Sequence, residues 1–178
     1  MQGRFANPDV VASHFHLREG EVVIDFGAGI GFYIPALAKA VGSEGRVYAC
    51  EIQKNLVEKI GMLVREKNLA NVETLWSDIE AVGGTKLRDE IADAGLLANT
   101  LFQLEDKPAA LREIMRVLRK GGRLFIIDWR DSFGGMGPQA QFVVSETAAK
   151  KFLEDAGFSF ERTIPVGEYH YGLVFRRP

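Results

Sequence analysis

The sequence is poor in cysteine, in long apolar runs and in excess charge. Its single cysteine, Cys50, can form neither an internal disulfide nor a cysteine cluster for a metal ion. No run of about 18 apolar residues is present, which excludes a membrane-spanning helix, and the first residues lack the apolar segment of a secretory signal. We therefore expect a cytoplasmic protein without a membrane span or a metal site.

Charge is nearly balanced along the chain. Lysine and arginine number 22 against 24 aspartates and glutamates, a net charge of −2, which argues against a broad surface for polyanions and leaves no strong nucleic-acid signal. At 178 residues and 47% hydrophobic content, we expect one globular domain over 1–178. Several basic residues are predicted to lie around the solvated face of a helix, with acids such as Glu113 between them: Arg112, Arg116, Arg119, Lys120 and Arg123.

Short apolar runs alternate with amphipathic segments. The runs predict strands at 22–26, 46–51, 72–76, 94–98, 123–129, 158–164 and 169–175. Helices are predicted at 8–15, 31–41, 55–67, 107–119 and 146–156, with a short one within 81–88, and with Asn7 and Ser145 as N-caps. This alternation predicts a Rossmann-like, doubly wound α/β sheet in three α/β/α layers with an antiparallel edge. We expect residues 1–20 to form an N-terminal helical cap segment and the glycine-rich segment 131–144 to be a mobile loop.

The most informative segment reads Val-Val-Ile-Asp-Phe-Gly-Ala-Gly-Ile-Gly over residues 22–31. An apolar strand, an acid and alternating glycines before a helix are typical of a turn that brings the backbone against a ligand. A dinucleotide fingerprint requires a third glycine where this chain has Phe32, so an NAD-linked reaction is disfavoured. Taken alone, such a turn also occurs for tight packing.

Polar residues end the predicted strands. Parallel strands place ligands outside their carboxyl ends, so these side chains should gather around one pocket: Asp25, Glu51, Asp78, Asn99 and Asp128. Glu51 follows Gly31 by 20 residues, a distance that suits hydrogen bonds to both hydroxyls of a ribose. Its carboxylate would repel a 2′-phosphate, whereas NAD or S-adenosylmethionine would suit it. The alternative for Glu51 is a solvated acid at a strand end.

From about Leu17 to Arg130 the chain resembles the class I S-adenosylmethionine (SAM) methyltransferases of type 11, the ubiquinone-biosynthesis-like kind. The resemblance rests on the 22–31 segment, on Glu51 and Asp78, and on Asn-Thr-Leu-Phe at 99–102. It also rests on Glu-Ile-Met-Arg-Val-Leu-Arg-Lys-Gly-Gly at 113–122, which is close to the signature E-x-x-R-V-L-K-P-G-G but lacks its proline. Many relatives carry histidines where this chain has Phe102 and Gln103, so a histidine-assisted step there is not expected.

The resemblance implies seven strands in the order 3-2-1-4-5-7-6, with the seventh antiparallel, and the binding of SAM, with S-adenosylhomocysteine as product. The implied cofactor residues are Asp25, Gly27, Ala28, Gly29, Gly31, Glu51, Ile52, Asp78, Ile79 and Asn99. Asp25 would orient the turn and meet the ligand's ammonium group. Asp78 would accept from the adenine amine with Ile79 against the ring, unless it caps the following helix. Asn99 would lie beneath the methionyl part, unless it only forms a turn.

The implied reaction is in-line methyl transfer to an unidentified, small acceptor, for which alignment supplies most of the rate. Asp128 is our candidate for contacting the acceptor, with Tyr33 and Trp129 as walls and residues 1–16 and 131–144 as the roof. His14 and His16 are interpreted as surface residues and His170 as structural. A non-catalytic SAM-binding sensor or partner module is the alternative function. Nothing in the sequence indicates the oligomeric state.

Overall fold

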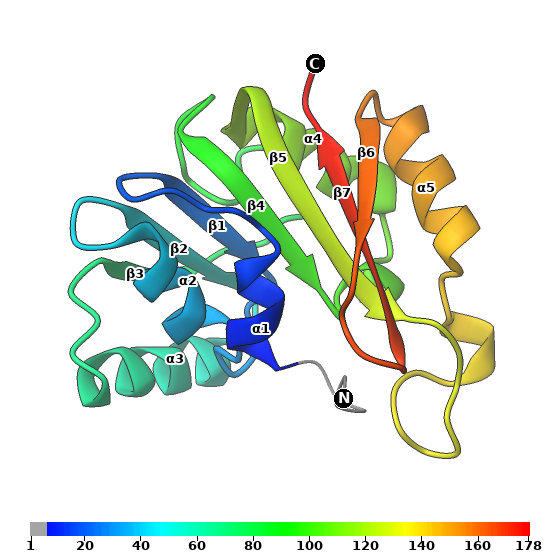
Figure 1. The fold of residues 1–178 in the computed structure, drawn as a ribbon, viewed down its shortest axis with the longest axis horizontal. Coiled ribbons are helices and arrows are strands. Elements are labelled where there is room, and N and C mark those ends of the chain that lie inside the picture. Colours follow the sequence, from blue (N-terminus) through cyan, green and yellow to red (C-terminus); the bar gives the residue numbers. More distant parts are fainter. Residues whose placement is uncertain (1–6) are drawn as a thin grey trace.

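The computed structural model describes residues 7–178, which form one sheet flanked by helices (Figure 1). The strands are β1 (Val22–Phe26), β2 (Arg46–Glu51), β3 (Val72–Trp76), β4 (Ala92–Ala98), β5 (Leu118–Trp129), β6 (Ser159–Ile164) and β7 (His170–Arg176). The helices are α1 (Pro8–Ser13), α2 (Ile34–Val41), α3 (Lys54–Glu66), α4 (Lys107–Val117) and α5 (Glu146–Asp155), with short 3₁₀ turns at Leu101–Gln103 and Ala140–Phe142.

The strand order is β3-β2-β1-β4-β5-β7-β6. Strands β1 to β5 pair in parallel, whereas β7 runs antiparallel to both β5 and β6. The predicted fold class, strand order and antiparallel strand are confirmed. Parallel strands deliver their carboxyl ends to one edge, which is where β1, β2, β3 and β4 lead into the loops discussed below.

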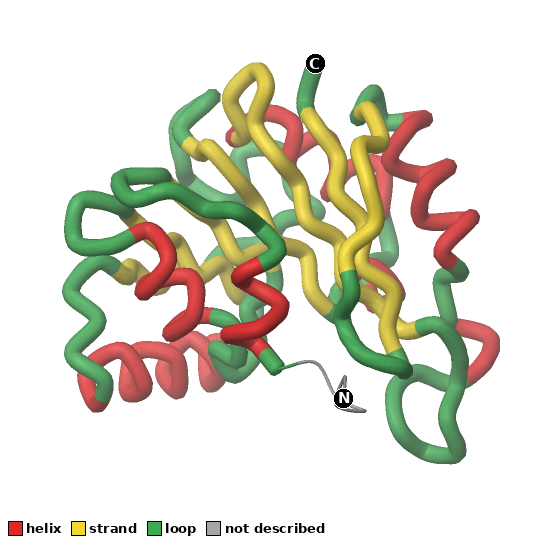
Figure 2. Tube along the Cα trace, viewed as in Figure 1, coloured by secondary structure: helices red, strands yellow, loops and turns green. Residues whose placement is uncertain are grey.

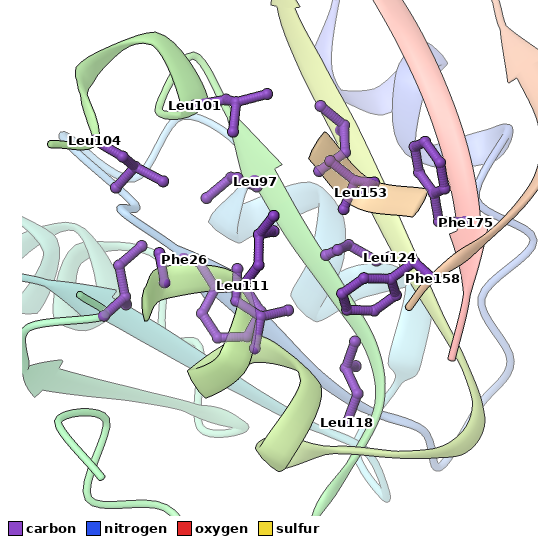
Figure 3. Close-up of a cluster of buried hydrophobic side chains, with 14 of the residues drawn as sticks. Phe26, Leu97, Leu101, Leu104, Leu111, Leu118, Leu124, Leu153, Phe158 and Phe175 are labelled. Carbon is purple, nitrogen blue, oxygen red and sulfur yellow. The ribbon is translucent and has the colours of Figure 1, made fainter. Parts of the chain in front are cut away.

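Two hydrophobic cores lie on opposite faces of the sheet. One packs α4 and α5 against β4 and β5, with Leu111, Leu153 and Leu97 among its buried residues (Figure 3). The other packs α1, α2 and α3, three of the helices drawn red in Figure 2, on the opposite face. Leu37 and Ile60 are fully buried in it. The predicted three-layer arrangement is therefore confirmed.

Two predicted helix caps are confirmed. The Asn7 side chain accepts hydrogen bonds from the backbone N–H groups of Asp9 and Val10, at 3.0 and 3.3 Å. The Ser145 hydroxyl accepts from the backbone N–H of Ala148 at 3.2 Å. These side chains replace the partners that the first turn of a helix lacks, which fixes where α1 and α5 begin.

Two predicted helix boundaries were wrong by a few residues. Helix α2 begins at Ile34 rather than at residue 31, because Gly31 has φ of 84° and belongs to the turn. Helix α4 ends at Val117, and the chain is extended from Leu118, which pairs with Ala92 of β4. The helical periodicity of the sequence continues to residue 119, but pairing with β4 ends the helix two residues earlier.

The predicted short helix within 81–88 was wrong, since this segment is a series of turns. Its backbone N–H groups at Gly83 and Thr85 donate to the Glu113 carboxylate, at 2.7 and 3.1 Å. Lys86 adopts φ of 60°, outside the helical region. An acid on α4 thus replaces the internal hydrogen bonds that a helix would need.

The prediction that the basic residues of 112–123 share a solvated helix face holds for Arg112, which is exposed on α4, and was wrong for the others. Arg116 pairs with Glu113 at 2.7 Å, and its side chain is only 21% exposed. Arg123 lies in β5, pairs with Glu21 at 2.6 Å and donates to the carbonyl of Phe15. Arg116 also donates to the Leu87 carbonyl at 2.8 Å, so both arginines connect segments that are distant in sequence.

No helix among residues 7–178 is long and apolar enough to cross a membrane. In the same residues no group of His, Cys, Asp and Glu side chains is placed to hold a metal ion, and Cys50 is a free, buried thiol.

Candidate cofactor-binding cleft

A cleft of about 250 Å³ lies at the carboxyl ends of β1, β2, β3 and β4. It is lined by Gly27, Gly29, Glu51, Ile52, Gln53, Leu56, Ser77, Asp78, Ile79, Glu80, Thr100, Gln103 and Leu104. These residues follow strands that sequence alone had predicted to end at one pocket. The cleft therefore brings together most of the predicted cofactor residues.

The glycine turn bends back over the end of β2. The N–H groups of Gly27 and Ala28 both donate to the Cys50 carbonyl at 2.9 Å. Gly27 has φ of 72°, and a Cβ there would meet the Thr100 side chain at 2.8 Å. Gly29 has φ of 58°, and a Cβ there would meet no protein atom within 4 Å. Gly27 is therefore required by packing, whereas the absence of a side chain at Gly29 leaves the cleft open for a ligand.

Glu51 holds the turn from the neighbouring strand. Its Oε2 accepts from the Gly29 N–H and its Oε1 from the Gln53 N–H, both at 2.9 Å. The residue is 6% exposed yet lines the cleft. Because each carboxylate oxygen has a further lone pair, Glu51 can accept from two ligand hydroxyls while keeping both backbone contacts. Glu51 is therefore held by two backbone hydrogen bonds and is not a freely solvated acid.

Asp25 lies beneath the turn and is 2% exposed. Burial first, and the negative charge of Glu51 second, raise the pKa of its carboxyl to about 7. Burial and the nearby Asp25 charge also raise the pKa of the Tyr33 hydroxyl. Two acids converge where a cationic group would relieve their repulsion, which makes this end of the cleft suited to an ammonium or sulfonium ligand.

Ile52 and Ile79 supply apolar surface at the other end of the cleft. Ile79 is buried, whereas Ile52 is 55% exposed. Beside them Asp78 accepts from the Glu80 N–H at 2.9 Å through Oδ1. No helix follows Asp78, so the alternative that Asp78 caps a helix was wrong. Asp78 can therefore accept a hydrogen bond from the polar edge of a ring that packs between Ile52 and Ile79.

Besides Asp25, four predicted residues lie beside the cleft without lining it. Ala28 and Gly31 belong to the turn itself, and Asn99 follows β4 with φ of 53°. Asp128 is 1% exposed and accepts from the N–H groups of Phe102 and Trp129, at 3.2 and 2.8 Å. Burial is the main reason that its pKa rises to about 6. Asp128 therefore holds the Leu101–Gln103 turn, which continues into the cleft wall.

Several lining residues escaped the sequence analysis: Gln53, Leu56, Ser77, Glu80, Thr100, Gln103 and Leu104. Gln53 and Glu80 follow a predicted acid by two positions, Ser77 precedes one, and Thr100 follows Asn99, so these four could have been found from the strand ends. Leu56 comes from α3, and only the packing of α3 beside β2 brings it to the cleft. The predicted roof over 1–16 falls partly on residues 1–6, which lie outside the described residues.

The cleft fits SAM in its chemistry. The open space at Gly29 suits the methionyl part of SAM, and the Glu51 carboxylate suits its ribose hydroxyls. The neighbouring acids Asp25 and Glu51 suit its cationic amino-acid end. The Oδ1 of Asn99 is buried without a hydrogen-bond partner among the described residues, as expected where a ligand completes the site.

Comparisons with known proteins agree with this chemistry. Residues 17–158 match the family model of a methyltransferase domain. Ubiquinone/menaquinone biosynthesis C-methyltransferase UbiE of Hydrogenovibrio crunogenus is 33% identical over 115 residues, which cover 64% of this chain and 44% of that protein. The structure of a SAM-dependent methyltransferase from Aquifex aeolicus is 35% identical, with a TM-score of 0.89 over 97% of this chain and 90% of that one. Geranyl diphosphate C-methyltransferase from Streptomyces coelicolor A3(2), 14% identical with a TM-score of 0.76 over 96% of this chain and 79% of that one, shares the fold.

The fold and cleft define a Rossmann-like, class I SAM-dependent methyltransferase. The chain belongs to the methyltransferase domain family, in its type 11 branch, and its cofactor is SAM. It spans less than half the length of the curated relative from Hydrogenovibrio, at 44%.

Proposed function

We propose that the chain transfers a methyl group from SAM to a small-molecule acceptor. The observation that carries this proposal is the hydrogen bond from the Gly29 N–H to Glu51. It places a carboxylate that can accept from ribose hydroxyls beside an open glycine turn within one cleft. When bound, SAM supplies an electrophilic methyl group on a sulfonium. The leaving group is a neutral thioether, so the protein has mainly to bind and align the reactants.

Each predicted cofactor residue has a role in this proposal. Asp25 holds the ammonium end, the backbone of the glycine turn contacts the methionyl part, and Glu51 accepts from the ribose hydroxyls. Asp78 accepts from the adenine amine, and Ile52 and Ile79 hold the ring. Asn99 offers its unpartnered oxygen beside the methionyl part.

Asp128 remains a proposal as an acceptor-side residue, with a role that follows from its contacts. It is buried, and its oxygens accept from the N–H groups of Phe102 and Trp129. We infer that it acts by positioning the Leu101–Gln103 turn and Trp129.

An electron-rich hydroquinone ring is our first candidate for the acceptor. UbiE proteins are named as C-methyltransferases of ubiquinone and menaquinone biosynthesis, and the chain is 33% identical to one of them over 115 residues. The same relatives favour catalysis over the non-catalytic sensor. A cytoplasmic location also stays a proposal.

The test incubates the purified protein with methyl-labelled SAM and 1,4-naphthoquinol under reducing, oxygen-free conditions. We expect a singly methylated ring product and S-adenosylhomocysteine in equal amounts, detected by mass spectrometry. The Gly29→Val variant, which fills the cofactor's space, should give neither. Tight SAM binding without transfer to this or other small acceptors would contradict the proposal and favour the sensor.

A further inference from the structure

A second feature of the sheet edge lies outside the cofactor cleft. Among the described residues, three buried side-chain atoms lack a hydrogen-bond partner: Oδ1 of Asn99 and both ring nitrogens of His170. His170 is only 5% exposed. A buried imidazole normally bonds through at least one nitrogen, so an unsatisfied ring calls for a functional explanation. The sequence-based interpretation of His170 as merely structural offers none.

His170 begins β7 and pairs in register with Trp129, the last residue of β5. On the other side of β5, the Asn99 N–H donates to the Ile127 carbonyl at 2.8 Å, and Thr100 lines the cofactor cleft. Neighbouring strands lie about 4.8 Å apart, so His170 stands roughly 10 Å along this edge from the end of β4. That separation suits one small ring between the cofactor cleft and the imidazole.

Aromatic side chains surround His170. Its ring centroid lies 4.3 Å from that of Trp129, with 42° between the planes. Phe133 lies 4.7 Å from Tyr169 and 6.5 Å from Trp129, again between ring centroids. Aromatic walls of this kind bind planar apolar ligands well, and a single polar group among them would set the orientation.

A small hairpin, residues 131–138, covers Trp129, and we call it the lid. Phe133 and Met136 exchange backbone hydrogen bonds at 3.3 and 3.1 Å around Gly134 and Gly135, whose φ values of 56° and 96° suit a tight two-residue turn. A Cβ on Gly137 would lie 2.6 Å from the Trp129 ring, so the lid rests directly on it. Within the described part of the chain, the backbone hydrogen bonds of the lid are internal. The lid can therefore lift without breaking the sheet.

We propose that His170 is the polar contact for the methyl acceptor, in a pocket that opens when the lid lifts from Trp129. The acceptor class is a planar ring that carries a hydroxyl or carbonyl oxygen. This inference rests on the proposed function and names the residue that recognises its substrate.

The charge state of His170 fits this role. Burial first, and the positive charge of Arg130 second, lower the pKa of the imidazole below its usual value. The ring is therefore neutral at pH 7, with one nitrogen as donor and the other as acceptor. A neutral ring can hydrogen-bond either a hydroxyl or a carbonyl oxygen without the cost of a buried charge.

The first experiment reads binding directly by NMR. The chain has 3 histidines, so the ring signals can be assigned with single substitutions. The protein saturated with S-adenosylhomocysteine, which cannot donate a methyl group, is titrated with 1,4-naphthoquinol. We expect a saturable shift of the His170 ring signals, with those of His14 and His16 unmoved. A saturable shift elsewhere in the protein that leaves His170 unchanged would overturn the proposal.

The second experiment separates recognition from structure through kinetics with the same quinol. His170→Phe keeps the aromatic packing and should raise KM at least tenfold, while the Kd for S-adenosylhomocysteine stays within twofold. His170→Gln restores a donor and an acceptor and should recover most of that loss. His16→Asn is the matched control and should leave KM unchanged. His16 has φ of 50°, which asparagine tolerates, and its side chain is exposed. Its carbonyl accepts from Arg123, which lies far from the carboxyl end of β5, so His16 is outside the predicted pocket.

The two failures are distinguishable. If the unaltered protein methylates the quinol and His170→Phe does so with the same KM, the inference about His170 is overturned and the proposed function stands. If the unaltered protein binds SAM but neither methylates nor binds the quinol, the proposed acceptor fails, and the inference falls with it.

Discussion

At the scale of single residues, Glu51 has two tasks at once. Its oxygens hold the N–H groups of Gly29 and Gln53, and the same carboxylate lines the cleft. A residue that fixes both the turn and a ligand should be more costly to lose than one that only contacts the ligand.

We expect Glu51→Ala to weaken SAM binding by about 1.5–3 kcal/mol, the scale of a lost charged hydrogen bond, which is roughly a 10- to 150-fold rise in Kd. Calorimetric titration measures it. Glu73→Ala is the matched control, since Glu73 makes only an exposed ion pair with Arg46 at 3.9 Å and should leave Kd unchanged. An unaltered Kd in Glu51→Ala would mean that the acid serves the turn alone.

Asp25 predicts a pH dependence of cofactor binding. Its carboxyl has a pKa of about 7 in the free protein, so it is largely protonated at pH 5.5 and half ionised at pH 7. Only the ionised form attracts an ammonium group, so affinity for S-adenosylhomocysteine should rise about tenfold over this range. The raised pKa also means that Asp25 stabilises the free protein most below pH 4 and loses this contribution as the pH rises toward 7.

Asp25→Asn should remove the pH dependence of binding and leave an affinity near that measured for the unaltered protein at low pH. Titrations at pH 5.5, 6.3 and 7.0 decide the matter. If the affinity of the variant rises with pH as it does in the unaltered protein, another group causes the pH dependence of binding.

At the scale of elements, α4 does more than cover the sheet. The Glu113 side chain is fully buried and accepts from Gly83, Thr85 and Arg116. Burial alone would raise its pKa, but these hydrogen bonds together outweigh burial and hold the pKa at about 2. The acid of the E-x-x-R pattern therefore fastens the 81–88 turns to α4.

We expect Glu113→Ala to lower the free energy of unfolding by about 2–4 kcal/mol at pH 7, because it leaves the N–H groups of Gly83 and Thr85 unpaired and removes one of the two carboxylates that pair with Arg116. The contribution is present above pH 4.5 and is lost as the pH falls toward 2, since the folded-state pKa is lowered. Urea unfolding at pH 7 and pH 3 should show a smaller difference at the lower pH. Glu154→Ala, an exposed change on α5, is the control. Equal differences at both pH values would contradict this account.

The elements also show where sequence suffices. Strands β1, β2 and β3 were predicted with their observed bounds, because each is a short run rich in β-branched or aromatic residues that begins after turn-forming residues and ends near an acid. The 81–88 segment could not be predicted, since its conformation depends on an acid 30 residues away at Glu113. In the same way, strand ends revealed Glu51 and Asp78, whereas His170 reaches the edge only because β7 pairs antiparallel with β5.

At the scale of the whole molecule, the cofactor cleft and the proposed acceptor side lie at different strands along one edge of the sheet. The ends of β1, β2 and β3 build the cofactor cleft, and the ends of β5 and β7, under the lid, build the proposed acceptor side. The Leu101–Gln103 turn after β4 joins the two, held from behind by Asp128. In this account both reactants lie along one edge of the sheet.

The most direct test of the cofactor cleft is a calorimetric titration of the protein and its Gly29→Val variant with SAM, S-adenosylhomocysteine and NAD. Gly134→Val is the matched control: it has nearly the same φ, 56° against 58°, and its Cβ also meets nothing within 4 Å, but it lies in the lid. We predict micromolar binding of SAM and S-adenosylhomocysteine but not NAD, lost in Gly29→Val and kept in Gly134→Val. Binding of NAD alone, or unchanged SAM affinity in folded Gly29→Val, would contradict the account.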